Sequence, residues 1–289
     1  MKWARRILHL VALMLLSIIA FSLIGLYLYR GTPHWYRPAL ASAQQIKDAA
    51  NSADQKLLDL FSWAAGAQAE RIRKLRGISG PDDSEGGPKT ITLTDDEVTS
   101  FFYSWSGPDK VDLEQRISRY FTDGRVIFTN DGIILAGNSP ALGTLVSMEF
   151  NAGIDNQGQL NLSLASMRAG LLPIPQSVAA PYFQRLQAVL EDKLAEEQPY
   201  VQIDRTMTAN AQALAASWLK LLLSSLAARP SDPTLIIPFD LAHLSRGLPV
   251  KLTNIKVEDG QITLTVQPLT PDDRQSLFEQ LQQRVPGAS

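Results

Sequence analysis

Apolar residues follow one another almost without a break from Ile7 to Tyr29, near the start of the chain. Leu10 to Tyr29 alone makes 20 residues without a charge. As a helix this stretch would be about 30 Å long, which matches the hydrocarbon core of a bilayer. Lipid offers no water to the backbone, so such a segment must be helical there. The pattern predicts a transmembrane anchor over residues 1–30.

Basic residues flank this run on both sides. Lys2, Arg5 and Arg6 precede it, whereas Arg30 and Arg37 follow it. The excess of positive charge on the N-terminal side favours a cytoplasmic N-terminus. We therefore expect a single-pass protein of the cytoplasmic (inner) membrane, with its C-terminal domain extracytoplasmic or periplasmic.

A cleaved signal peptide is the alternative interpretation, with Ala20-Phe21-Ser22 as the small-x-small cleavage site. Against it, residues 23–29 stay apolar beyond that point. The run also exceeds the roughly 7–15 residues of a signal-peptide core. The anchor is the interpretation that we carry forward.

Residues 31–76 are expected to hold a juxtamembrane segment and then a long helix over residues 39–76, which contain no proline. Apolar side chains recur in this helix at alternating spacings of four and three. The stripe either packs on the rest of the protein or forms the seam of a dimeric coiled-coil stalk. Its members are Ile46, Ala50, Ala53, Leu57, Leu60, Ala64 and Ala67.

A flexible linker of glycine, proline and acidic residues is predicted over residues 77–89, and one domain over residues 90–289. The domain opens with a short strand, Thr90–Leu93. Thr94 and Glu97 then form a capping box that starts a helix reaching about Trp105.

Alternating apolar and polar residues predict an antiparallel meander of about four strands with one apolar face and one wet face. Turns are expected at residues 129–132 and 155–158. A closing hairpin is expected over residues 250–266, with a bulge near Asn254 where the alternation breaks. Amphipathic or apolar helices are predicted at residues 178–197, 208–228 and 272–284.

Composition excludes several classes of function. The 27 basic and 29 acidic residues give a net charge of −2, and the chain after residue 29 carries 24 basic and 29 acidic residues, or −5. Such a domain is a poor nucleic-acid binder. The chain has no cysteine, which removes thiolate chemistry and Cys-ligated metals.

No catalytic motif is complete. Gly137-Asn138-Ser139 lacks the final glycine of G-x-S-x-G. His243 lies near Asp240, but one such pair is more often structural than catalytic. No histidines have metal-ligand spacing, and no phosphate-binding loop is present. We expect no enzymatic activity, no cofactor and no metal.

The order of these parts resembles the YpmS-like family of membrane-anchored bacterial proteins of unknown function. The likeness rests on Ile91–Val98, on Gly170–Pro175 and on the hairpin Val250–Val266. More loosely, the strand–Gly–Leu–Pro–helix corner looks like BPI-like tubular lipid-binding proteins. The resemblance implies an α+β fold in which a curved antiparallel sheet packs on a long amphipathic helix, with an apolar ligand groove.

We therefore expect a non-enzymatic domain that binds a lipid or other apolar ligand at the cell envelope. The alternative is an envelope scaffolding protein that uses the 39–76 helix to dock a protein partner or to dimerise. The expected partners are the membrane, an apolar ligand or an envelope protein, and not nucleic acid. The residues expected to bind the ligand are Phe101, Phe102, Trp105, Leu171, Ile174 and Phe183.

Overall fold

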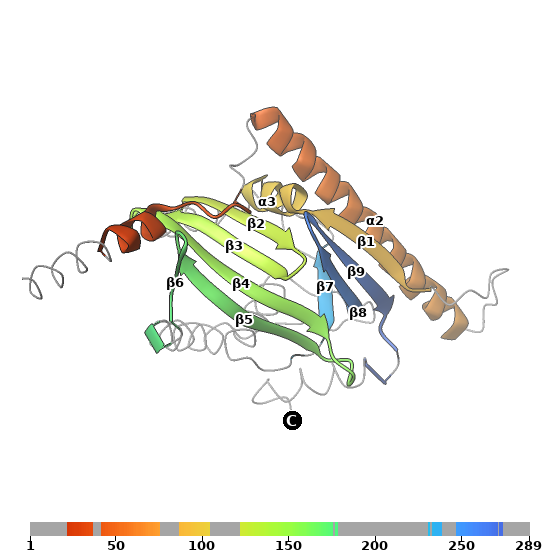
Figure 1. Ribbon diagram of the computed structural model, residues 1–289. Helices are drawn as coiled ribbons and strands as arrows, with labels where there is room; N and C mark the ends of the chain where they lie inside the picture. The colour runs from red at the N-terminus through yellow and green to blue at the C-terminus, as the bar shows by residue number, and fades with distance from the viewer. Residues whose placement is uncertain are drawn as a thin grey trace, which may run out of the picture.

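The computed structural model describes residues 22–36, 42–75, 87–104, 122–175, 177–178, 231, 233–238, 247–270 and 272–273. Within these ranges, helices combine with two antiparallel sheets, which confirms the α+β class (Figure 1). Two sheets replace the single sheet that was expected. The elements are α2 (Ala43–Leu75), β1 (Lys89–Thr94), α3 (Asp95–Ser104), β2 (Thr122–Thr129), β3 (Gly132–Ser139), β4 (Thr144–Ile154), β5 (Leu160–Ala169), β6 (Leu172–Pro173), β7 (Thr234–Pro238), β8 (Gly247–Glu258) and β9 (Gln261–Pro268).

The first sheet has four strands in the order β1-β9-β8-β7 and joins the two ends of the domain. Ile91 pairs with Leu264 and Leu93 with Ile262, which puts their side chains on one face of the sheet. Threonines fill the opposite face, where Thr92 Oγ1 lies 3.0 Å from Thr263 Oγ1. The predicted bulge near Asn254 is confirmed by a register shift between residues 252 and 254.

The second sheet is a meander of five strands in the order β2-β3-β4-β5-β6. Both predicted turns are confirmed, at residues 130–131 and between β4 and β5. Gly132 is needed for close approach, because a Cβ there would lie 2.3 Å from the Phe150 carbonyl oxygen. In the second turn, the Asp155 carboxylate accepts the Gln157 and Gln159 backbone N–H groups.

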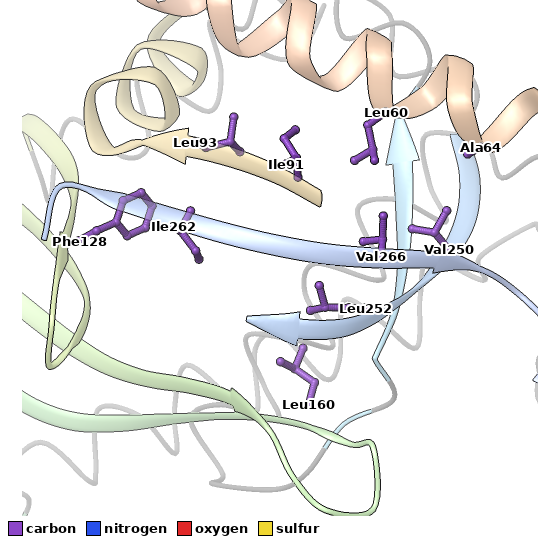
Figure 2. Close-up of a cluster of buried hydrophobic side chains, with 10 residues drawn as sticks. All are labelled: Leu60, Ala64, Ile91, Leu93, Phe128, Leu160, Val250, Leu252, Ile262 and Val266. Carbon is purple, nitrogen blue, oxygen red and sulfur yellow. The ribbon is translucent and has the colours of Figure 1, made fainter. Parts of the chain in front are cut away.

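One apolar core lies between α2 and the two sheets (Figure 2). Leu60 and Ala64 of α2 face the first sheet, and Phe128 and Leu160 reach the same core from the second sheet. The sheets also meet at their turns, where the Gly260 N–H donates to the Phe128 carbonyl at 3.0 Å. The other buried members are Ile91, Leu93, Val250, Leu252, Ile262 and Val266.

Helix α2 lays the predicted apolar stripe on the domain. Its bounds, residues 43–75, lie close to the predicted 39–76. Ala50, Ala53, Leu60 and Ala64 are buried, although an alanine stripe has little area of its own. Small residues at these positions let the helix approach β1 and α3 closely. The apolar stripe of α2 therefore packs against the rest of the same chain.

The predicted capping box of α3 is confirmed. The Glu97 N–H donates to Thr94 Oγ1 at 3.2 Å, and the Thr94 N–H donates to Glu97 Oε2 at 2.8 Å. The same carboxylate accepts a hydrogen bond from Ser52 Oγ of α2 and forms an ion pair with the Lys56 ammonium of α2 at 2.7 Å. Glu97 thus caps α3 and holds it to α2.

Several predicted segments lie outside the described residues, or nearly so. They are residues 1–21 of the anchor, most of the 77–89 linker, nearly all of the helices at 178–197 and 272–284, and the whole of 208–228. In the part of the chain that is described, no helix combines the length and apolarity needed to cross a bilayer.

The buried stripe of α2 predicts different outcomes for two leucines on the same helix. Leu60 is 5% exposed and Leu58 is 42% exposed. Leu60→Ala should lower the free energy of unfolding by about 2–4 kcal/mol, because it leaves a cavity in the core. Leu58→Ala should change it by less than about 0.5 kcal/mol. Chemical denaturation measures both, and an equal effect of the two changes would contradict the packing.

The Glu97 network predicts a pH-dependent stability. Burial by itself raises the pKa of Glu97, but hydrogen bonds from Lys56, Ser52 and the Thr94 backbone outweigh it, so the net pKa falls below its usual 4.5. A carboxyl with a depressed folded-state pKa stabilises the fold above its unfolded pKa. That contribution is lost as pH falls through the folded pKa.

Glu97→Gln should therefore lower the free energy of unfolding by about 1–3 kcal/mol at neutral pH. The difference from the unmodified protein should shrink as the pH falls below the usual pKa of about 4.5. Glu258→Gln is the matched control, because Glu258 pairs with Lys256 at the surface, where solvent screening makes such a pair contribute little to stability. Denaturation at several pH values measures both variants, and a Glu97→Gln effect that is independent of pH would contradict the role of the charge.

Candidate functional site

Apolar side chains form continuous rows across one face of the five-stranded sheet. The strand registers put Val126 opposite Leu135, Leu135 opposite Met148, and Met148 opposite Met167. Residues directly opposite each other in antiparallel strands point to the same face. This row therefore crosses β2, β3, β4 and β5 on one side of the sheet.

A second row lies two residues along β2, β3 and β4 and three residues along β5, and two shorter pairs extend it. Because side chains alternate along a strand, every second position returns to the same face. The second row consists of Phe128, Ile133, Phe150 and Leu164, and the pairs are Ala152 with Leu162 and Ile154 with Leu160. We call the set formed by both rows and both pairs the apolar face.

A bulge keeps this face continuous. Glu149 pairs with Ser166 while Phe150 pairs with Leu164, so Ala165 is the extra residue in β5. Without that residue, one end of β5 would turn its leucines to the opposite side. A bulge also bends its strand and increases the local twist. The apolar face therefore lies on a locally bent part of the sheet.

Only part of the apolar face is covered. Phe128 and Leu160 are buried where this sheet meets the other one, and Phe150 is buried beside them. The rest of both rows stays half-buried, which leaves apolar surface in contact with solvent. Contiguous apolar surface of this kind commonly marks a binding site. The half-buried members of the apolar face are Val126, Ile133, Leu135, Met148, Ala152, Ile154, Leu162, Leu164 and Met167.

The opposite face is less wet than the alternation predicts. Trp35 and Tyr36 pack there against a second buried cluster, formed by Ile127, Ile134, Ala136 and Leu145. The reason lies in the consecutive apolar residues at 126–128 and 133–135, which supply apolar side chains to both faces. The expectation of one apolar and one wet face is thus corrected. Trp35 and Tyr36 cover what would otherwise be a second apolar surface.

The helical segment 22–30 ends against this sheet. The Leu171 N–H donates to the Leu28 carbonyl at 2.7 Å, and Thr144 Oγ1 donates to the Tyr29 carbonyl. The Tyr29 hydroxyl in turn donates to the Leu142 carbonyl. The last carbonyls of a helix have no partner within the helix. Here the sheet supplies partners to two of them.

Gly170 makes this docking feasible. Its φ is +62°, in the left-handed region that favours glycine. A Cβ on it would lie 2.1 Å from the Tyr29 carbonyl oxygen, so a side chain would collide with the helix end. The Gly170 N–H also donates to the Leu145 carbonyl at 2.6 Å. We call the contact of residues 28–31 with Leu142, Thr144, Gly170 and Leu171 the helix-docking corner.

Three of the six residues predicted to bind the ligand can be placed with their side chains. Phe101 is half-buried on α3, which adjoins β2 at one edge of the sheet. Leu171 and Ile174 lie at the opposite edge, where the Ile174 N–H donates to the Met167 carbonyl at 2.8 Å. Phe101 and the other two are therefore not neighbours. The side chain of Phe102, and all of Trp105 and Phe183, lie outside what is described.

The sequence predicted the Gly170 segment as a corner between a strand and a helix. The structure adds a further property, because the segment receives the N-terminal helix. It also shows that the apolar face is made from the meander strands themselves. The alternation of residues 146–154 and 160–164 was the available signal for that face.

The ionisable side chains around Arg125 form ion pairs or are partly buried, and the phenols among them are not activated for catalysis. Arg125 is buried and pairs with Asp96. Burial raises the pKa of the Tyr36 and Tyr103 phenols, and the charge of Asp123 raises both further, against the opposing effect of Arg125. These phenols stay protonated at neutral pH, so neither is an activated nucleophile or base. Among the described residues, no three His, Asp or Glu side chains gather as a metal site.

No family model matches the chain, and neither a curated protein nor a solved structure is significantly similar to it.

The helix-docking corner predicts unequal effects for two glycines that share a left-handed φ. Gly158 has a φ of +72° and open space around it, whereas a Cβ on Gly170 meets the Tyr29 carbonyl. Gly158→Ala should lower the free energy of unfolding by about 1–2 kcal/mol, because of backbone strain alone. Gly170→Ala should add steric overlap of about 1–3 kcal/mol or release the helix.

Amide hydrogen exchange distinguishes release of the helix from general destabilisation. With Gly170→Ala, protection of the Leu171 amide should fall while protection of the β3 and β4 amides in the sheet is largely kept. With Gly158→Ala, protection of the Leu171 amide should stay as in the unmodified protein. Equal protection of that amide in both variants would show that docking does not depend on the glycine.

Proposed function

We propose that the protein is a non-enzymatic, membrane-tethered domain that binds a lipid or other apolar ligand at the cell envelope. The ligand would lie on the apolar face of the five-stranded sheet. The observation that carries this proposal is the pair of rows that begin at Val126 and Phe128, because most of their members are only half-buried. Ligand sites are usually concave and mainly apolar, and the bend at the β4–β5 bulge supports such a shape.

The cover of this face is part of the proposal. We propose that the curved sheet packs on the long amphipathic helix predicted for residues 178–197, with the ligand between them. Two details support this arrangement. The chain leaves β6 beside Met167, and the Val178 N–H then donates to the Pro175 carbonyl, as in a first helical turn. The sequence that follows carries a wide apolar stripe.

The tether is the second part. Residues 1–30 would act as a single-pass anchor in the cytoplasmic membrane, with the domain on the extracytoplasmic side. Support comes from the apolar run and its flanking charges, and from helix 22–30, which ends at the helix-docking corner. Under this proposal, the resemblance to the YpmS-like family describes a shared arrangement of anchor, strand meander and closing hairpin.

The alternative is an envelope scaffold that dimerises or docks through the 39–76 helix. It has less support, because Ala50, Ala53, Leu60 and Ala64 of that helix are buried within the chain itself. A helix whose apolar stripe is already packed has only its polar side left for a partner. Among the described residues, most of the apolar face of the sheet stays half-buried instead, which leaves apolar area for a ligand.

Two substitutions on neighbouring residues of β5 test the proposal. Leu162 lies half-buried on the apolar face, whereas Asn161 is exposed on the other side. Leu162→Asp adds a charge to the ligand surface, and an ionised carboxylate is strongly disfavoured against apolar groups. The matched control Asn161→Asp adds the same charge elsewhere. The full chain is extracted from membranes, and native mass spectrometry measures its bound lipid.

The expected result is retained lipid in the unmodified chain and in Asn161→Asp, and at least a tenfold lower lipid occupancy in Leu162→Asp. Circular dichroism checks that each variant is folded. Met167→Trp is the uncharged companion, since it fills the face with a larger apolar side chain and should also exclude the ligand. Lipid that is absent from the unmodified chain, or equally bound by every folded variant, would overturn the proposal.

A further inference from the structure

Exposed large apolar side chains gather at the end of the protein that receives the N-terminal helix. Among the described residues, Tyr27 is 73% exposed, Leu142 50% and Leu172 37%. Leu142 is in the β3–β4 turn and Leu172 is in β6, so they come from separate parts of the chain. Leu23, Ile24 and Leu26 of the same helix are exposed as well. Such clustering differs from the single exposed apolar residues that are normal on any surface.

Direct contacts tie Leu142 and Leu172 to the helix end. The Leu142 carbonyl accepts the Tyr29 hydroxyl, and Leu172 follows Leu171, whose N–H donates to the Leu28 carbonyl. Each exposed leucine is therefore within one residue of the helix-docking corner. Leu142 and Leu172 lie beside the point where the helix leaves the sheet.

The junction between helix 22–30 and the five-stranded sheet is held rigidly. Hydrogen bonds hold two helix carbonyls, and Gly170 lies too close to the Tyr29 carbonyl to accept a Cβ. Figure 1 shows the segment 22–30 at one end of the strands of the five-stranded sheet, away from α2 and the four-stranded sheet. The orientation of helix 22–30 relative to the five-stranded sheet is therefore fixed, and the residues around the helix-docking corner form the end of the protein nearest to the helix.

The sequence before residue 22 indicates what lies at that end. The uncharged stretch from Leu10 runs into helix 22–30 and stops at Tyr29, and the exposed Arg30 comes next. Tyrosine and arginine at the end of an apolar segment are typical of the headgroup layer. Leu142 and Leu172 are beside this boundary, because the Leu142 carbonyl accepts the Tyr29 hydroxyl and Leu172 follows Leu171, which bonds to Leu28.

We infer that this end of the domain is a membrane-contact surface, with Leu142 and Leu172 inserted in the headgroup layer of the bilayer that holds the anchor. This inference rests on the tether in the proposed function. The occupant is the lipid surface, because the chain itself leads into it and the exposed groups are apolar with a flanking arginine. The β6 edge of the apolar face would then open beside the bilayer, so a lipid could pass between membrane and sheet.

The absence of cysteine allows a test with single labels on the full chain. Leu142→Cys and Leu172→Cys carry an environment-sensitive NBD fluorophore, and the chain is reconstituted in vesicles of phosphatidylcholine and phosphatidylglycerol. Asp131→Cys is the matched control, since it is exposed in the turn at the other end of β3, roughly 25 Å away along an eight-residue strand. Iodide quenches labels in water, and lipids with a nitroxide on the acyl chain quench labels in the bilayer.

Labels at 142 and 172 should be quenched by the nitroxide lipid and show at least a threefold lower iodide quenching constant than the label at 131. Thr144→Val, which removes a donor to the Tyr29 carbonyl, should raise iodide quenching at 142 while the chain still floats with vesicles. If the chain floats but all three labels are equally open to iodide, this inference fails and the tether stands. Labels shielded from both quenchers would also overturn the inference, because protein and not lipid would then cover this end, and a chain that does not float overturns the tether as well.

Discussion

The two sheets depend on one apolar core that forms only when distant parts of the chain meet. Strand β1 starts at residue 89 and pairs with β9, which ends at residue 268. Leu60 of α2 packs on this pair from one side, and Phe128 and Leu160 join from the other sheet. Closing so long a loop has an entropic cost that only the buried apolar area offsets. The five-stranded meander, by contrast, is built from neighbouring strands.

Local signals in the sequence predict much of this fold. The Thr94–Glu97 capping box, the bulge near Asn254 and the turn at residues 155–158 all depend on residues close in the chain, and all are confirmed. The division into two sheets was not predictable in the same way. Strand alternation shows that residues 90–93 form a strand, but it holds no information about a partner some 170 positions later. Pairing of that kind is fixed by packing and not by local pattern.

The same distinction between local pattern and distant contacts applies to the candidate site. Alternation in the meander strands predicted an apolar face, and the registers then determine which residues share a row. Periodicity missed the coverage of the opposite face by Trp35 and Tyr36, because that contact joins two residues near the start of the chain to strands about a hundred residues away. Gly170 belongs to the strand–Gly–Leu–Pro–helix corner that the sequence predicted. Its role as the seat of a helix end depends on a contact with Tyr29, which no local pattern contains.

The helix-docking corner also fixes the rotation of helix 22–30 about its own axis. The carbonyls of residues 28 and 29 each have a fixed partner, so the helix cannot turn about its own axis without breaking both hydrogen bonds. Since successive helical residues are separated by about 100°, the azimuth of every upstream side chain follows for as long as the helix stays regular. Leu23 and Tyr27 are four positions apart and therefore lie on one side of the helix. That side keeps a fixed orientation relative to β6. A single residue inserted between positions 27 and 28 would redirect that side by about 100° while leaving the sheet unchanged.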